Sequence, residues 1–567
     1  MNMIDERTDT MHKADETAPD HTEHAGDSRP HVVMMSANTV VVDARVLKYA
    51  RTVAQFGVRV TAVGLSSGRS SRDLLFQNLD VVQVAVPARY RGAGLRARLR
   101  RLGHGFAEIY RAIRPWYVTQ EEYRVGLAPW QRATRAIRSV RGRTQRDHDR
   151  PAGPAPQRPA PPGALLKLSW RYRKVQRYVL AAMATPLRFT SRRRRGKDRT
   201  SSLRGNGNRL ALYQRFPRLA RWRDVAPEIV DQELAIGPVL DSLRPDVVHV
   251  HDVYLLGAAA QHAHRAALDG RMVKVVYDAH EYVLGLANVK PRRVAAMRAL
   301  EQEYLGDTDK IITVSPQIAE VLRTDYHLRE TPDVVLNATV AGDPEAEVPS
   351  VRDLAEVPED VPLLVYGGGV VYERGVHTVV GALPQLPGVH LVVVVKRANT
   401  ATVALEHLAE DLAVRDRLHF APYVDAESVP RYFRSATVGV SPLLHAPNHD
   451  MAITNKFCEY LAAGIPIVTS DTQAQAELVR DLDLGAVHRA DDADDCARAL
   501  REVLDRLPEL RKRIADDDKL RHRFSWAAQA EKVREIYAEL MGGLPDQAWR
   551  PEATVVRQLL APAEETP

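Results

Sequence analysis

Cysteine is nearly absent from this chain, whose 567 residues include only Cys458 and Cys496. The two cysteines lack a metal-like CxxC spacing and do not form the dense, even set of a disulfide scaffold, so neither a zinc site nor such a scaffold is expected. Reduced thiols of this kind are typical of a cytosolic protein. The sequence also lacks an apolar run of about 18 residues, the length needed to cross a bilayer. Any action on membranes is therefore expected at their surface.

The N-terminal segment lacks the basic start and the apolar run of a secretory signal. Residues 1–29 are polar and acidic, which predicts a disordered tail. A second tail is predicted over 542–567. Between the tails, the chain is too long for one core, and with 45% hydrophobic residues it has enough apolar side chains to fill two.

Charge is distributed unevenly along the chain. The formal net charge is +7. Between Arg89 and Arg204 there are roughly 30 Lys and Arg against about 6 Asp and Glu, so this region carries about +24 and the remainder about −17. Two chemically different parts therefore share one chain.

Strand and helix patterns alternate in two series. The first series occupies residues 30–340, and an acidic, proline-containing stretch without periodicity at 341–362 predicts a linker. The second series occupies 363–525 and is followed by a helix predicted over 526–541. The predicted strands are HVVMMS, VRVTAVG, PDVVHVHD, MVKVVYDAHE and KIITVS in the first series, and VPLLVYGGG, HLVVVVK, DRLHFAPY, ATVGVSPL and IPIVTSD in the second. Repeated units of this length predict parallel sheets with helices on both faces.

A basic insert, residues 89–208, interrupts the first series. It contains a low-complexity stretch, PAGPAPQRPAPPG, and an amphipathic helix predicted over Leu165 to Leu187, followed by the cluster RRRRGK. Such a helix beside an arginine cluster favours an anionic membrane surface as partner. Nucleic acid is not expected, because aromatic stacking positions are missing and the rest of the chain is acidic. A solvated polycation without a partner is the simplest alternative.

The stretch TNKFCEYLAAGIPIVTSD, Thr454 to Asp471, joins charged residues to a helix and a buried strand. Asn455 and Lys456 stand one turn before Glu459, a small-residue turn ends the helix, and a β-branched strand follows. An acid and a lysine near a helix N-terminus at a sheet edge suit a ligand that carries hydroxyl and phosphate groups.

A second informative stretch is YGGGVVYERGVHTVV, in which three glycines precede Arg374. Gly367 to Gly369 allow a ligand to approach the backbone closely. The helix predicted after Arg374 points its positive end toward the same place. This turn is therefore also predicted to bind an anion.

These two stretches resemble the donor-binding motifs of the family-4 retaining glycosyltransferases. The resemblance covers roughly residues 45–540 apart from the insert, and FSWAAQAEKVREIY is similar to the family's usual ending. It implies an α/β protein of GT-B fold, in which two Rossmann-like, doubly wound domains face a cleft and a C-terminal helix crosses back to the first domain.

The resemblance also implies the donor contacts. Glu459 would hold the nucleotide ribose and Arg374 the diphosphate. The family's first glutamate falls on Met451, with Asp450 as the nearest substitute, and a second arginine of many relatives is replaced by Gly369, with Lys396 as the candidate for the missing charge. The full set of predicted donor-binding residues is Gly368, Gly369, Arg374, Lys396, Asp450, Thr454, Asn455, Lys456 and Glu459.

The acceptor side is expected at the ends of the strands in the first series, where ligands bind in open α/β sheets. His280 matches the family histidine that lies near the donor sugar, and Asp252 lies in the block that borders the acceptor. The predicted acceptor residues are Asp43, Arg45, Asp252, His280 and Glu281, and the predicted catalytic residues are His280, Arg374, Lys396 and Glu459. Of His249 and His251, at most one is expected to share a face with a site residue.

The predicted function is transfer of a sugar, with retention, from a nucleotide-diphosphate sugar to a glycan or a lipid-linked precursor. No cofactor or metal is expected, because side chains and helix ends generally neutralise the leaving diphosphate in this family. The predicted location is the cytoplasm, peripheral at the inner face of the plasma membrane. Two alternatives remain open: a nucleotide-sugar 2-epimerase, and a non-catalytic membrane-surface protein on a degenerate fold.

Overall fold

The structure is a computed structural model that describes residues 29–545 apart from 67, 69, 77–78, 89–220, 287–288, 341 and 343–346. The chain divides into two compact units. The larger unit contains both sheets and comprises the segments up to Pro87, Gln232–Ala287 and from Gln302 onward. In the smaller unit, Ala88–Asp231 with Asn288–Glu301, the described elements are α7 (Trp222–Val225), the start of α8 and most of α10.

The first sheet has the order β3-β4-β2-β1-β5-β6-β7-β8, and every pairing in it is parallel except that of β3 with β4. Its strands are β1 (His31–Ser36), β2 (Arg59–Ser66), β3 (Ser71–Phe76), β4 (Leu79–Ala85), β5 (Val247–His251), β6 (Lys274–Asp278), β7 (Lys310–Thr313) and β8 (Asp333–Val334). The strand order reverses between β1 and β5. This reversal is the switch point at which doubly wound sheets bind ligands.

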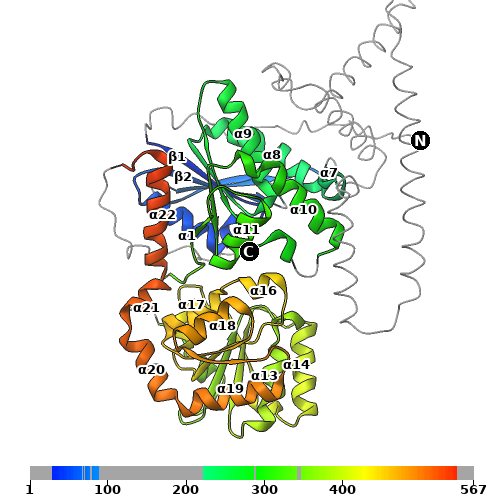
Figure 1. Cartoon of the computed structure of the whole chain (residues 1–567), viewed down its shortest axis with the longest axis vertical. Coiled ribbons are helices and arrows are strands. Elements are labelled where there is room, and N and C mark those ends of the chain that lie inside the picture. Colours follow the sequence, from blue (N-terminus) through cyan, green and yellow to red (C-terminus); the bar gives the residue numbers. More distant parts are fainter. Residues whose placement is uncertain are drawn as a thin grey trace, which may run out of the picture. The chain divides into compact units, whose positions relative to one another are not determined.

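Both faces of the first sheet are covered, as the alternation along β1 shows. Val32 and Met34 join the core that α1 (Ala44–Ala54) and α22 (Trp526–Met541) complete. Val33 and Met35 point to the opposite face, where α8 (Pro227–Leu243) and α9 (Leu256–Leu268) pack (Figure 1). Helix α11 (Pro316–Asp325) also belongs to the larger unit, whereas α10 (Pro291–Tyr304) lies mostly in the smaller one. A strand buried on both faces explains the unbroken apolar run HVVMM.

The second sheet is wholly parallel, with the order β11-β10-β9-β12-β13-β14. This is the 3-2-1-4-5-6 order of a Rossmann fold, with its switch point between β9 and β12. The strands are β9 (Leu363–Gly367), β10 (His390–Val395), β11 (Leu418–Pro422), β12 (Val438–Ser441), β13 (Ile467–Ser470) and β14 (Gly485–His488). The helices are α12 (Val351–Leu354), α13 (Val376–Ala382), α14 (Thr400–Asp411), α15 (Val429–Phe433), α16 (Pro447–Met451), α17 (Asn455–Ala463), α18 (Gln473–Asp481), α19 (Ala493–Asp505), α20 (Leu507–Asp516) and α21 (Asp518–Arg523).

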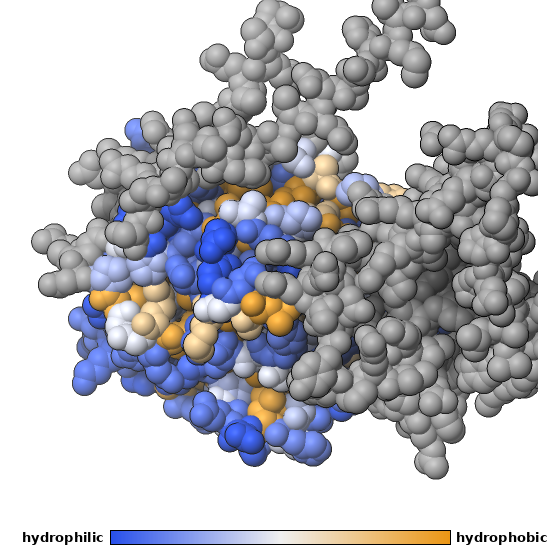
Figure 2. Space-filling view, turned by 90° about the horizontal axis from the view of Figure 1, so that it is seen from above, coloured by the Kyte–Doolittle hydropathy of each residue, from blue (hydrophilic) through white to orange (hydrophobic). Residues whose placement is uncertain are grey.

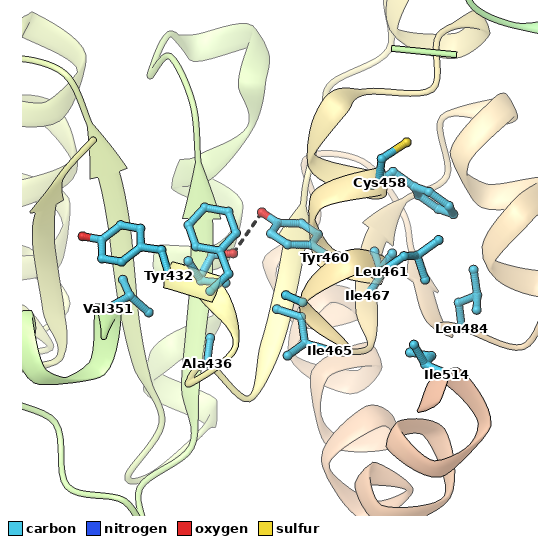
Figure 3. Packing of buried hydrophobic residues seen from close by; sticks show 14 of the residues in the cluster. Val351, Tyr432, Ala436, Cys458, Tyr460, Leu461, Ile465, Ile467, Leu484 and Ile514 are labelled. Carbon is cyan, nitrogen blue, oxygen red and sulfur yellow. Dashed lines mark hydrogen bonds between the residues drawn. The ribbon is translucent and has the colours of Figure 1, made fainter. Parts of the chain in front are cut away.

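Helix α17 is anchored to the second sheet by its buried side chains. Figure 3 shows Tyr460 and Leu461 packed among Ile465, Ile467 and Leu484. The Tyr460 hydroxyl donates to the backbone carbonyl of Val365 at 3.1 Å, the bond drawn in that figure. The helix that carries Lys456 and Glu459 therefore has a fixed position on the sheet.

The last described helix crosses back to the first sheet, as predicted. Trp526 and Tyr537 of α22 are buried in the core around β1 and α1. The Trp526 indole N–H donates to the Thr52 hydroxyl at 2.8 Å, and the Tyr537 hydroxyl lies 2.8 Å from His249 Nδ1. The predicted fold of two Rossmann-like domains with a crossing helix is confirmed.

The ten predicted strands are all present, with ends shifted by a few residues. The sequence patterns missed β3, β4, β8 and β14, and the stretch predicted as a linker contains α12, whose Val351 is buried in the second core. The other domain boundaries stay predictions. Nearly all of both predicted tails and the whole basic insert with its amphipathic helix lie outside the described residues.

Among the described residues, no helix combines the length and the apolar composition needed to cross a membrane. On the coloured part of the face in Figure 2, hydrophobic side chains form several patches separated by hydrophilic ones.

Candidate functional site

The second sheet presents a glycine turn at its switch point. Gly367 ends β9, and Gly368 follows with φ 130° and donates its N–H to the Val394 carbonyl at 3.3 Å. A Cβ added to Gly368 would lie 3.5 Å from Lys456 Nζ. Gly369 is exposed, with no neighbour within 4 Å of the Cβ position. The backbone of Gly368 and Gly369 is thus open beside a cation, whereas a Cβ at Gly367 would lie 2.6 Å from the Phe433 ring, so Gly367 serves packing rather than ligand approach.

Arg374 is held at the same edge by a second conformational constraint. The next residue, Gly375, has φ 70°, and a Cβ there would lie 1.7 Å from the Pro442 carbonyl oxygen. Only glycine satisfies both conditions. Arg374 is half-buried, and α13 begins immediately after this glycine.

Lys456 and Glu459 lie one helical turn apart on α17, close to the glycine turn. The Lys456 ammonium lies 5.0 Å from the centre of the Tyr366 ring, and the Tyr366 hydroxyl donates to the Gly369 carbonyl at 2.9 Å. Lys456 is only 7% exposed. Within the described residues its ammonium has no hydrogen-bond or ion-pair partner. A buried ammonium without such a partner favours the binding of an anion.

The electrostatics agree with this geometry. Burial and the nearby Arg374 charge lower the pKa of Lys456 to about 8. Burial raises the pKa of Glu459, which the Lys456 and Lys48 charges oppose. Two cations lie close together here, and a diphosphate would stabilise the charge of Lys456 that Arg374 disfavours.

Of the other predicted donor residues, Thr454 and Asn455 start α17. The Thr454 hydroxyl donates to Gln475 Oε1 at 2.9 Å, so it positions the helix, whereas Asn455 is exposed. Lys396 is exposed directly after β10. Asp450, in α16, accepts a hydrogen bond from His445 at 2.7 Å. The structure therefore brings Gly368, Arg374, Lys456 and Glu459 together, whereas within the described residues neither Lys396 nor Asp450 makes a hydrogen bond or ion pair with them.

At the first sheet, Asp43 caps α1 beside the switch point. Its carboxylate accepts hydrogen bonds from the Ser36 hydroxyl (2.9 Å), the Asn38 amide (3.1 Å) and the Val46 N–H (3.3 Å). Burial would raise the pKa of Asp43, but these hydrogen bonds outweigh it and lower the pKa. The contacts give Asp43 a structural role in the loop that was predicted to meet the acceptor.

Arg45 points inward rather than toward a ligand. It is 7% exposed and its guanidinium binds both oxygens of Asp278, at 2.7 and 2.8 Å. His251 Nδ1 lies 2.9 Å from the same carboxylate. Arg45 was predicted to lie on the acceptor side, and the structure instead places it in a buried ion pair, which hides it from an acceptor.

The expectation for His249 and His251 was wrong. Residues i and i+2 of a strand share a face. Their rings stack at 4.5 Å with an interplanar angle of 12°, and both contact Tyr49 edge-on. Burial lowers the pKa of both histidines, although the Asp278 carboxylate opposes this. Both therefore belong to the buried network around Asp278.

Asp252 and His280 lie at the accessible edge of the first sheet. Asp252 Oδ1 is 3.4 Å from His280 Nε2, and each side chain is 27% exposed. Burial raises the pKa of Asp252, with His280 opposing and Asp278 adding to the increase. Glu281, the next residue along, is exposed. The structure thus brings together the predicted acceptor residues Asp252 and His280.

His249, His251 and Asp278 form the one group of potential metal ligands found in the described part of the chain, with donor atoms within 4.8 Å of one another. Asp278 already accepts two hydrogen bonds from Arg45, whose charge would repel a cation. The nearly parallel rings direct their in-plane nitrogen lone pairs side by side rather than toward one point. The group does not fit a metal centre.

Sequence reasoning missed Tyr366 and the buried pairing of Asp278 with Arg45. Tyr366 had a local signal, because it is the aromatic residue directly before the glycine turn. The bond between Arg45 and Asp278 joins residues 233 positions apart. No local pattern indicates such a pairing.

Two family models match this chain. The model of glycosyl transferases group 1 matches residues 361–506, and that of glycosyltransferase family 4 matches residues 173–339. Together they cover more than half of the chain; the first match contains β9 to β14, and the second contains β5 to β8. Fold and matches define a class: enzymes of GT-B fold that transfer sugars. The chain belongs to the family-4 glycosyltransferases.

The chain is similar to several curated proteins. It is 29% identical over 247 residues to the lipopolysaccharide core biosynthesis glycosyltransferase LpsE of Rhizobium meliloti. The matched region is 43% of this chain and 66% of that protein, which is just under two thirds of its length. It is 26% identical over 323 residues to the D-inositol 3-phosphate glycosyltransferase of Mycolicibacterium smegmatis, covering 54% of this chain and 70% of that one.

Solved structures with similar folds include a sucrose-phosphate synthase from Thermosynechococcus elongatus, with a TM-score of 0.55, 13% identity and coverage of 91% of this chain and 100% of that one. Another is an E. coli protein described as trehalose-6-phosphate bound with UDP-2-fluoro glucose, with a TM-score of 0.51, 13% identity and coverage of 90% and 98%. These likenesses support the fold.

Proposed function

We propose that this protein transfers a sugar, with retention of configuration, from a nucleotide-diphosphate sugar to a hydroxyl group of a glycan or lipid-linked acceptor. The observation that carries the proposal is the buried Lys456 ammonium, which has no anionic partner within hydrogen-bond distance in the described residues and lies beside the glycine turn and Arg374. A diphosphate would supply the missing negative charge.

The roles of the remaining donor residues follow from their positions. Arg374 and Lys456 stabilise the charge of the leaving diphosphate, and the open backbone of Gly368 and Gly369 lets it approach. Glu459, one turn further along α17, accepts hydrogen bonds from ribose hydroxyls. Because two cations are available, transfer is proposed to proceed without a metal ion.

On the acceptor side, His280 and Asp252 are proposed to bind the sugar and the acceptor hydroxyl. A retaining transfer in which acceptor and leaving group share one face needs positioning more than a strong protein nucleophile. This agrees with an edge at which a histidine and a carboxylate are in contact.

Nucleotide release from UDP-glucose and GDP-mannose tests the proposal. We expect release that depends on an added glycan or lipid-linked acceptor and persists in EDTA, and we expect Glu459→Ala to lose it while remaining folded. Full activity of Glu459→Ala would contradict the role of Glu459, and abolition by EDTA would contradict transfer without a metal.

The same assay separates the two alternatives that the sequence left open. A 2-epimerase would convert the donor without any acceptor. A non-catalytic surface protein would release no nucleotide from any donor. Anomeric analysis of the product tests retention directly.

Surface binding to an anionic membrane is proposed from the sequence of the basic insert, where attraction is worth about 1 kcal/mol per basic residue near the surface. We expect the full chain to sediment with vesicles that contain phosphatidylglycerol, and to be released by high salt. Equal binding to neutral phosphatidylcholine vesicles would contradict this mechanism.

A further inference from the structure

Asp252 has an unusual backbone conformation, with φ 67° and ψ 161°. This combination of dihedral angles is nearly confined to glycine, because a Cβ atom crowds the neighbouring peptide groups. Other non-glycine residues of the described chain also have positive φ, such as Ala413 at 54°. Asp252 is the one among them that lies at the switch point of the first sheet.

The residues around Asp252 hold it in this conformation. His251, directly before it, is 1% exposed and bound to the Asp278 carboxylate. The Asp252 N–H donates to the Asp278 carbonyl at 3.1 Å. Asp278 is itself fully buried and is fixed by both hydrogen bonds from Arg45. Both the peptide before Asp252 and its amide are thereby anchored to one residue, Asp278.

The constrained backbone has a consequence for the side chain. The Asp252 carboxylate faces His280 Nε2 at 3.4 Å, and His280 lies two residues after Asp278. Both partners of this contact are therefore attached to the ends of β5 and β6, and Arg45 fixes the residue that connects them. Arg45 is too deeply buried to contact a substrate.

We propose that Arg45 is a positioning residue, which acts through Asp278 to hold Asp252 in a strained backbone conformation that orients His280 at the acceptor edge. The part that concerns catalysis rests on the proposed function, because it assumes that His280 serves sugar transfer. The part that concerns the backbone stands without it.

A pair of substitutions isolates the strain. Asp252→Gly and Asp252→Ala both remove the carboxylate, so they differ only in backbone freedom. At an unstrained position alanine is the more stabilising residue of the two. At Asp252 we expect the reverse, with the glycine variant melting at the higher temperature. The control pair is Asp411→Gly and Asp411→Ala, at an exposed helical position, where glycine should melt lower. If Asp252→Ala melts at as high a temperature as Asp252→Gly, the backbone at Asp252 is not strained and the proposal is overturned.

The Arg45→Lys variant tests the connection to His280. Lysine keeps the charge that compensates Asp278 but cannot bind both of its oxygens. We expect the ¹⁵N NMR signals of the His280 ring, assigned by their loss in His280→Gln, to shift in Arg45→Lys in the same direction as in Asp252→Ala. We also expect kcat for nucleotide release to fall tenfold or more, with UDP affinity within twofold of wild type.

The positioning role of Arg45 is overturned if Asp252→Ala shifts the His280 signals but Arg45→Lys leaves them at their wild-type position. If Arg45→Lys does not fold, Asp278→Asn serves instead, with the same expected shift. Failure of the proposed function has a different signature: the wild type would release no nucleotide, whereas the melting order and the NMR shifts would still test the inference.

Discussion

The two sheets end in edges of the same topology but opposite electrostatic character. At the first sheet, the charges of Arg45 and Asp278 neutralise each other inside the protein, and His251 contacts the same carboxylate. At the second sheet, Lys456 and Arg374 lie close together, and the Lys456 charge has no close anionic partner among the described residues. The comparison shows that the same sheet topology can serve two purposes. At the first sheet the buried charges are paired within the protein, and at the second sheet a ligand would complete the pairing.

The largest effect is expected from breaking the pair at the first sheet. Arg45→Met would leave the Asp278 carboxylate buried with only His251 as partner, at a cost of about 3–5 kcal/mol. Urea denaturation measures this loss. The control is Arg498→Met, an exposed arginine paired with Asp495 and Glu502, for which a loss of about 0–1 kcal/mol is expected. Equal losses in the two variants would show that the buried pair has no special role.

The opposite result is expected at the second sheet. Lys456→Met removes a buried charge that has no hydrogen-bond or ion-pair partner among the described residues, so the free energy of unfolding should stay the same or increase. The affinity for UDP or GDP should fall roughly 10- to 100-fold, because a charge-assisted contact is worth about 1.5–3 kcal/mol. Calorimetric titration measures the affinity, and exposed Lys519→Met is the matched control. A large loss of stability in Lys456→Met would reveal an internal partner and remove the contrast.

Acid should destabilise the first-sheet network. The pKa values of His249 and His251 are lowered by burial in the folded protein, so the unfolded chain binds protons more readily below pH 6.5. The contribution of the two neutral histidines to the free energy of unfolding is fully present above about pH 6.5. It is lost as the pH drops toward the folded-state pKa, by up to about 1.4 kcal/mol per pH unit for each histidine. Urea denaturation between pH 7.5 and 5.5 should show this decline, with a shallower slope in His249→Gln. An identical slope in the variant would contradict the assignment to His249.

Nucleotide binding should weaken at alkaline pH. Because the pKa of Lys456 is lowered to about 8 in the free protein, its ammonium loses its proton as the pH rises through that value. UDP affinity should therefore fall severalfold between pH 8 and 9, by at most about tenfold per pH unit. Lys456→Met should show no such decline. A decline that persists in this variant would assign the titration to another group.

The smallest effect is expected for Lys396→Ala. Lys396 is exposed after β10, where a charge contributes about 0–1 kcal/mol and is screened by salt. UDP affinity should therefore fall by less than about fivefold at 0.15 M salt. A fall in UDP affinity as large as that of Lys456→Met would show that Lys396 binds the diphosphate, as the sequence predicted.

The sequence could reveal those features whose signals are local. The apolar runs of β9 and β10, the glycines before Arg374, and the spacing of Lys456 and Glu459 on one helix are all short-range patterns, and each was found. Strand β14, with the sequence GAVH, begins with glycine and alanine, which are depleted in strands, so no β-branched run marks it. The burial of Arg45 against Asp278, across 233 positions, arises only when β6 and α1 meet in the fold. The shared face of His249 and His251 was accessible from strand geometry and was misjudged.

The most direct test of the central claim is to titrate the wild-type protein with UDP, GDP and the corresponding nucleosides by calorimetry, and to repeat the titrations with Lys456→Met. If Lys456 and Arg374 form an incomplete diphosphate site, one nucleoside diphosphate should bind at least about 100-fold more tightly than its nucleoside, and most of this difference should vanish in the variant. Equal affinity of the diphosphate and the nucleoside, or a difference that Lys456→Met leaves unchanged, would contradict the account.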